Sequence, residues 1–157
     1  MRNFIIITSA AVAMMVSSAR AEDIAGSYDV KFEEMGHNCN PPPVALGRSK
    51  LAITTFPKKN ALSVNIETIP VMDGIPQKGG KINAKTSKVL ATTVQGLDAK
   101  YSIAGKIDDS GILQLVLVAE YIKHDDKKPY CTQSWNVTGA KGTPDAGDKP
   151  AKPDKKK

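Results

Sequence analysis

The sequence predicts an all-β fold, an antiparallel up-and-down barrel of about eight strands, with a two-sheet β-sandwich as the alternative. Between residues 26 and 139, apolar and polar residues alternate with a period of two, as in half-buried strands. The alternating runs are short and regularly spaced, and turn-forming residues separate them. Helix signals are nearly absent from this stretch. These observations indicate one β-barrel domain over residues 22–140.

Eight segments carry the alternation. In chain order they are 27–33, 50–56, 61–69, 80–86, 88–94, 99–107, 111–123 and 132–139. Turns are predicted between them at "PKKN", "DGIPQKGG", "QGLD" and "DDSG", where Gly, Pro, Asn and Asp gather. The stretch "NPPPVALGR", residues 40–48, is predicted to be a loop because proline has no N–H to donate to a central strand.

The two cysteines, Cys39 and Cys131, predict a disulfide, with free thiols or a bridge between chains as alternatives. In a meander with an even number of strands, the first and the last lie side by side once the sheet closes. Cys39 follows the first strand and Cys131 opens the last, so the bridge would join the two strands that close the barrel. A packed sandwich would accept the same bridge. Closing a loop of about 90 residues is worth on the order of 4–5 kcal/mol in the chain-entropy model.

Residues 1–21 have the pattern of a secretory signal peptide with a signal helix. Arg2 supplies the positive charge, residues 4–16 form the apolar region, and Ala19-Arg20-Ala21 forms a cleavage site. The apolar run is short of the roughly 20 residues of a spanning helix, which disfavours a membrane anchor. Glu22 stands where a lipoprotein would have cysteine. We therefore predict export to a bacterial periplasm or to the medium, without a membrane anchor after cleavage.

The net charge of +6 comes mostly from the two ends of the chain. Residues 141–157 carry six lysines and three aspartates, and their Pro, Gly and Ala content predicts a disordered tail. Without this tail and the two arginines of residues 1–21, the net charge is +1. The domain has no basic stripe interleaved with aromatic residues, so we predict no nucleic-acid partner.

The start of the first strand carries a resemblance to known families. Gly26-Ser27-Tyr28 opens a small exported barrel and resembles the Gly-x-Trp start of the lipocalin and wider calycin group, with tyrosine in place of tryptophan. The architecture also looks like the small periplasmic barrels that inhibit secreted metalloproteases, although their disulfide placement differs. The first resemblance implies ligand binding and the second implies a protein partner. Neither transfers a functional residue.

Catalytic motifs are missing from the sequence, and we predict that the protein is not an enzyme and has no cofactor. Neither His37 nor His124 sits in an H-E-x-x-H pattern, and there is no nucleophile elbow or phosphate loop. A hydrolase would need both histidines to line one cleft. If the disulfide forms, His37, His124, Asp125 and Asp126 become candidate ligands for zinc or copper at one barrel end. Solvated loop histidines are the simpler interpretation, so no metal site is predicted.

The function predicted first is a soluble, exported, non-enzymatic binding protein that holds a small apolar ligand inside the barrel. An eight-stranded barrel has room for packed side chains or for one small ligand. The predicted lining residues are the inward-facing Tyr28, Val30, Phe32, Ile53, Val64, Ile103, Leu115 and Trp135.

The alternative is a protein-interaction module, such as a periplasmic inhibitor or an envelope accessory factor. Segment 111–123 is apolar on both faces, with Val116 and Val118 on the predicted outer face. We expect the loop at residues 40–46 to cover this outer face. A partner protein packed on it is the competing interpretation.

Overall fold

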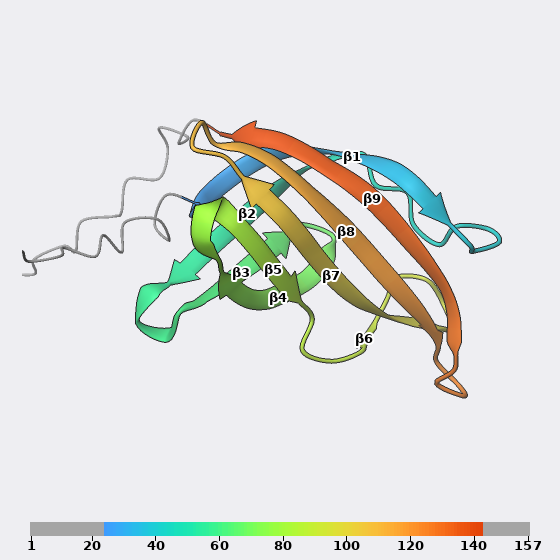
Figure 1. Ribbon diagram of the computed structural model, residues 1–157. Coiled ribbons are helices and arrows are strands. Elements are labelled where there is room, and N and C mark those ends of the chain that lie inside the picture. Colours follow the sequence, from blue (N-terminus) through green and yellow to red (C-terminus); the bar gives the residue numbers. More distant parts are fainter. Residues whose placement is uncertain (1–23, 143–157) are drawn as a thin grey trace, which may run out of the picture.

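The structure, a computed structural model, describes residues 24–142, which are almost entirely β (Figure 1). Its strands are β1 Gly26–His37, β2 Arg48–Phe56, β3 Ala61–Ile66, β4 Ile69–Pro76, β5 Lys81–Lys85, β6 Leu90–Ala91, β7 Leu97–Ile107, β8 Ile112–Lys123 and β9 Pro129–Lys141. Two short 3-10 turns accompany them, η1 Pro57–Lys59 and η2 Lys78–Gly80. The predicted signal peptide, residues 1–21, lies outside the described residues. So does the predicted tail, residues 141–157, except for Lys141, which ends β9, and Gly142. None of the helices in the described part has the length and apolar character that crossing a membrane requires.

The strands form one closed antiparallel barrel. Each of β1 to β5 pairs with the next along the chain, β5 pairs with β7, and β7, β8 and β9 continue the meander. Pairing of β1 with β9 closes the ring, so eight strands make the barrel wall. The predicted up-and-down barrel is confirmed over the sandwich alternative. The ninth strand, β6, only extends the start of β7, where Leu90 lies opposite Ala99.

The number of barrel strands was predicted correctly, but one of the eight predicted segments is not a barrel strand, and one barrel strand was missed. Residues 69–76 form the missed strand β4, whereas the sequence analysis ended a strand at residue 69 and placed a turn over residues 73–80. Two prolines and Gly74 interrupt the alternation there, leaving Met72 as the one central buried side chain. Residues 88–94, predicted as a strand, contribute only the two residues of β6. Val89, Leu90 and Val94 are half-buried and Ala91 is exposed, because the segment crosses the barrel end instead of joining the wall.

Inward-facing side chains fill most of the barrel. The eight predicted interior residues are all buried, with exposed fractions of at most 5%. Further buried side chains from β2, β3, β4, β8 and β9 complete the core, among them Leu51, Leu62, Met72, Leu113 and Val137. This packing follows from the period-two alternation, which sends every second side chain of each strand to the interior.

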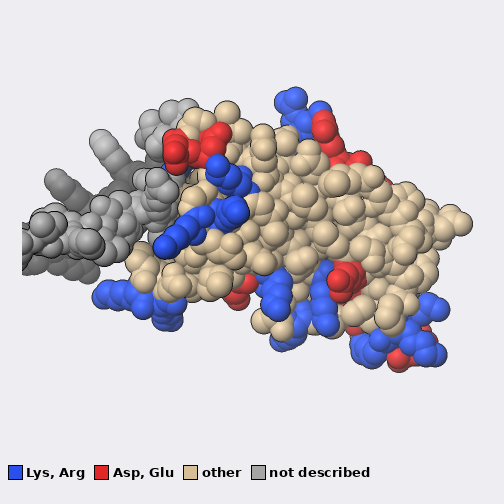
Figure 2. Space-filling model, in the orientation of Figure 1, with Lys and Arg blue, Asp and Glu red and all other residues tan. Residues whose placement is uncertain are grey.

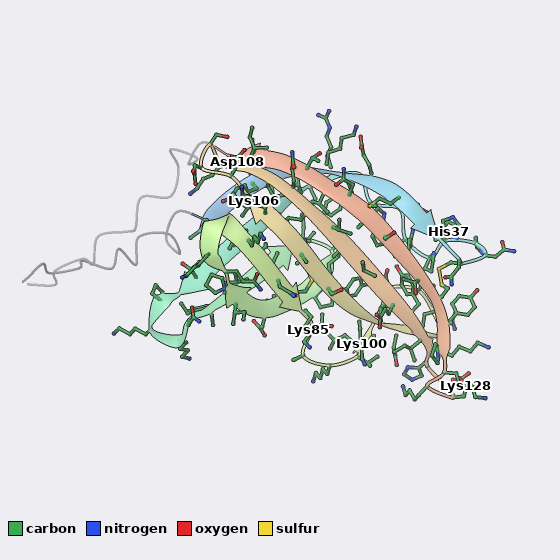
Figure 3. All side chains as sticks on the ribbon, viewed as in Figure 1. His37, Lys85, Lys100, Lys106, Asp108 and Lys128 are labelled. Atoms are coloured by element: carbon green, nitrogen blue, oxygen red, sulfur yellow. A yellow bond between two sulfur atoms is a disulfide. The ribbon has the colours of Figure 1, made fainter. Side chains whose placement is uncertain are left out.

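The loops divide between two barrel ends. One end, the open end, carries loop 38–47, turn 67–68, loop 86–96 and turn 124–128. Figure 3 places His37 and Lys128 at this end and Asp108 at the opposite one. At that opposite, closed end, the Tyr28 hydroxyl donates a hydrogen bond to the carbonyl of Ile24, at 2.8 Å, and both residues are buried.

The predicted disulfide Cys39–Cys131 is confirmed, with the two Cα atoms 5.1 Å apart. It links the end of β1 to the start of β9, beside the pairing that closes the barrel. Two hydrogen bonds reinforce the seam: the Asn38 N–H donates to the Thr132 carbonyl at 3.2 Å, and the Thr132 N–H donates to Asn38 Oδ1 at 2.6 Å. The disulfide also fits an oxidising compartment, where thiols pair.

Candidate functional site: a cavity at the open end of the barrel

A cavity of about 590 Å³ lies at the open end. Its floor consists of three aromatic side chains, Tyr101 of β7, Tyr121 of β8 and Trp135 of β9. Its rim comes from three chain segments that meet over the barrel mouth, and its rim residues are Val44, Ala45, Leu46, Glu67, Thr68, Ile69, Pro70, Ala91, Thr92 and Thr93. This volume falls within the range of about 300–1,000 Å³ that is usual for small-molecule sites.

The strand register explains why space remains above the aromatic floor. Tyr101 lies directly opposite Ala119, and Tyr121 lies directly opposite Ala99. Both alanines are fully buried. Each large ring therefore has a small cross-strand neighbour, and the four inward positions do not fill the barrel cross-section as four large side chains would.

A buried polar network holds loop 38–47 over this mouth. Gln133 is fully buried, and its Nε2 donates to the carbonyl of Val44 at 2.7 Å and to Glu34 Oε2 at 3.2 Å. The Tyr121 hydroxyl donates to Gln133 Oε1 at 3.3 Å. The Phe32 N–H adds a hydrogen bond to the Gly47 carbonyl at 2.8 Å. The amide of Gln133 is therefore satisfied on both sides by the protein itself.

Two further polar groups of the floor are not paired within the described residues. The structure gives neither the Tyr101 hydroxyl nor the Trp135 indole N–H a hydrogen-bond partner there. Tyr101 is only 7% exposed and Trp135 only 1%, and both line the cavity. Burial raises the pKa of Tyr101, so its hydroxyl stays protonated at neutral pH. Burial, followed by the nearby Tyr101 and Glu34, also raises the pKa of Tyr121. The floor thus presents two unused donors to whatever occupies the cavity.

The cavity wall is nearly uncharged. Glu67, at the exposed β3–β4 turn, is the one ionisable carboxylate among the lining residues, and none of the lining residues is Lys, Arg or His. Most of the lining is aliphatic, aromatic or threonine. Such a wall suits an apolar molecule with few polar groups.

The structure separates the eight predicted lining residues into two groups. All eight belong to the buried core, and Trp135 alone of the eight also lines this cavity. Tyr101 and Tyr121 were recognisable as inward-facing positions from their alternation. Their place at the open end depends on the strand directions and on the loops above them, which the alternation does not reveal.

The candidate metal ligands do not assemble. His37 contacts residues close to it in the chain: its Nδ1 lies 2.9 Å from the Cys39 carbonyl, and its Nε2 lies 3.4 Å from Glu34 Oε1. His124 contacts Asp98 through Nδ1, at 3.0 Å. Asp125 is exposed, and Asp126 accepts from the Lys128 N–H at 3.1 Å and lies 3.3 Å from its ammonium. Within residues 24–142, no three His, Cys, Asp or Glu residues are grouped so that they would hold a metal ion.

The outer face of β8 is not covered by loop 38–47, contrary to expectation. Val116 is 39% exposed and Ile112 is 46% exposed. The loop instead turns over the barrel mouth, because its Val44 carbonyl accepts from the inward-facing Gln133. Figure 2 shows a broad uncharged area in the middle of the visible face, with the charged side chains toward its edges. In the sheet, Ala104 and Asn136 flank Val116.

Comparison of the chain with protein-family models, with curated proteins and with solved structures found no significant match. The closed antiparallel barrel is compatible with the lipocalin-like resemblance of Gly26-Ser27-Tyr28. No family is assigned by these comparisons.

Proposed function

We propose that this protein is an exported, non-enzymatic binding protein that takes a small apolar ligand into the cavity at the open end. The observation that carries the proposal is the cavity of about 590 Å³ at the barrel mouth, with its aromatic floor of Tyr101, Tyr121 and Trp135. Concave, mostly apolar sites with a few convergent polar groups are the usual form of small-molecule sites. A lipocalin-like mode of binding belongs to the same proposal.

Export is supported by two independent features. Residues 1–21 have the charge, apolar run and cleavage pattern of a signal peptide. The disulfide Cys39–Cys131 is of the kind that persists in oxidising compartments.

Titration with Nile red, a neutral apolar dye, tests the proposal. We expect saturable binding to the oxidised protein, with dye fluorescence rising and the emission of Trp135, the single tryptophan of the chain, changing in parallel. Ala45→Phe adds bulk to the rim at an exposed position and should weaken binding. Val116→Lys, on the outer wall, is the matched control and should leave binding unchanged.

Native mass spectrometry of protein purified from an oxidising periplasm complements the titration. An added small mass that disappears on denaturation would identify the ligand class. Dye binding that is absent, or that Ala45→Phe and Val116→Lys reduce equally, would count against the cavity as the site.

The second candidate function is a protein-interaction module that uses the outer face of β8. The exposed Val116, which lies between the uncharged Ala104 and Asn136 in the sheet, favours it. Under this proposal, replacing Val116 and Val118 together by lysine should abolish binding of a partner and leave Nile red binding intact.

A further inference from the structure

We propose that the open-end cavity selects neutral apolar molecules that carry a hydrogen-bond acceptor, such as a ketone or ester carbonyl, over plain hydrocarbons and over carboxylates. This inference rests on the proposed function and specifies the ligand class for that site. It follows from which polar groups of the floor are already used and from the charge of the wall.

The hydrogen-bonding groups of the floor divide into used and unused ones. Tyr121 donates to Gln133, and both hydrogens of the Gln133 amide go to Val44 and Glu34. The Thr92 hydroxyl bonds the carbonyls of its own loop, at 2.8 and 3.1 Å. On the floor, the hydroxyl of Tyr101 and the indole N–H of Trp135 remain for a ligand. The hydroxyls of Thr68 and Thr93 are also without a hydrogen bond to the described residues, but these two residues belong to the exposed rim.

The two unused groups, the Tyr101 hydroxyl and the Trp135 indole N–H, can both donate a hydrogen bond to an acceptor on the ligand. An indole N–H only donates, and a phenol hydroxyl donates as well as accepts. A hydrocarbon that displaced water from this floor would leave two buried donors without partners, which costs free energy for each. A carbonyl oxygen reaching the floor would accept from one donor or from both, while the rest of the molecule contacts apolar side chains.

The charges around the cavity disfavour anions. A carboxylate entering the cavity would meet no cation among the lining residues and would approach Glu67. A second carboxylate, the exposed Glu34, is paired with Trp135 in the sheet and accepts a hydrogen bond from Gln133. Moving an unpaired carboxylate from water into such an environment is costly, whereas a neutral carbonyl avoids that cost.

Three biphenyls that differ at one substituent test this selectivity. The substituents are a methyl ketone, its isopropenyl isostere without oxygen, and a carboxylate, and each compound competes with Nile red for the oxidised protein. We expect the ketone to bind roughly three- to tenfold more tightly than the isopropenyl compound, as one net hydrogen bond implies. The carboxylate should bind most weakly, and Glu67→Gln should narrow its disadvantage.

Tyr101→Phe identifies the donor. This variant should lose roughly three- to tenfold in affinity for the ketone and should not lose affinity for the isopropenyl compound. Tyr28→Phe is the matched control, because it removes a buried hydroxyl at the closed end, and it should change neither affinity. Trp135→Phe, followed by dye displacement, tests the second donor in the same way. If a variant does not fold, the ranking of the three compounds by the unmodified protein decides the question.

The outcomes separate the two proposals. Equal affinities for the ketone and the isopropenyl compound, or tightest binding of the carboxylate, would overturn the proposed selectivity. Nile red binding in the same experiment would still support the cavity as a binding site. An equal loss for ketone and isopropenyl compound in Tyr101→Phe would overturn the hydroxyl's role as donor. If neither Nile red nor any biphenyl binds, the proposed function fails together with the inference.

Discussion

Replacing Cys39 and Cys131 together by alanine should lower the free energy of unfolding by about 4–5 kcal/mol while leaving the barrel folded. The bridge spans a sequence separation of 92 residues, which corresponds to about 4.6 kcal/mol of lost loop-closure entropy in the unfolded chain. The native seam should survive, because the Asn38–Thr132 hydrogen bonds and the β1–β9 pairing hold it without the sulfurs.

Urea unfolding followed by circular dichroism, at equal protein concentration for both proteins, measures this effect. The dependence on urea should become steeper in the variant, because its unfolded chain is less compact and exposes more surface. Unmodified protein kept in reductant is the second reference and should match the variant. A loss below about 1 kcal/mol would refute the reasoning, since it would mean that the cross-link hardly restricts the unfolded ensemble.

Three further predictions concern the loops and the wall. Gln133→Leu should destabilise the protein by about 1–3 kcal/mol, since it leaves buried partners without hydrogen bonds, and hydrogen exchange should become faster in loop 38–47. The hydrogen bond from Lys127 lowers the pKa of Asp98. The stability that this carboxylate adds is therefore present above its ordinary pKa and lost as pH falls through the lowered value. In urea unfolding, Asp98→Asn should have a lower free energy of unfolding than the unmodified protein, and this difference should shrink in acid. A difference independent of pH would contradict the reasoning. Gly139→Ala should lower the free energy of unfolding by about 1–3 kcal/mol, because a Cβ there would collide with backbone and side-chain atoms of β1. Gly47 has open space around it, so Gly47→Ala is the control and should be near neutral in thermal unfolding. Equal losses for the two variants would argue against the steric cause.

Much of the fold could be predicted from the alternation of apolar and polar residues within each segment. Alternation of period two marks inward positions without knowledge of neighbouring strands, and Tyr28, Val30 and Ile53 were identified as buried in this way. The disulfide was also predictable, because an even number of strands brings the two chain ends of the meander together. Segments 69–76 and 88–94 were misassigned because prolines and Gly74 mask alternation in a true strand, while Val89, Ala91 and Thr93 imitate it in a loop.

The candidate site was predictable only in part. Trp135 was expected to contact a ligand and does line the cavity, but so was Leu115, which belongs to the packed core. Both are inward-facing residues in regular strands, and their sequence surroundings do not distinguish them. In the β8–β9 pairing, Trp135 lies two residues nearer the open end than Val137, the residue opposite Leu115.

The sequence by itself determined the all-β class, the closing disulfide and most of the inward-facing residues, because these depend on alternation and chain order. Only the tertiary structure decided where the barrel interior is filled and where it is open. That outcome depends on cross-strand register, which sets Tyr101 opposite Ala119, and on loop 38–47, which Gln133 holds over the mouth. Register and loop path are set by contacts between residues far apart in the chain, and the alternation within one segment does not reveal those contacts.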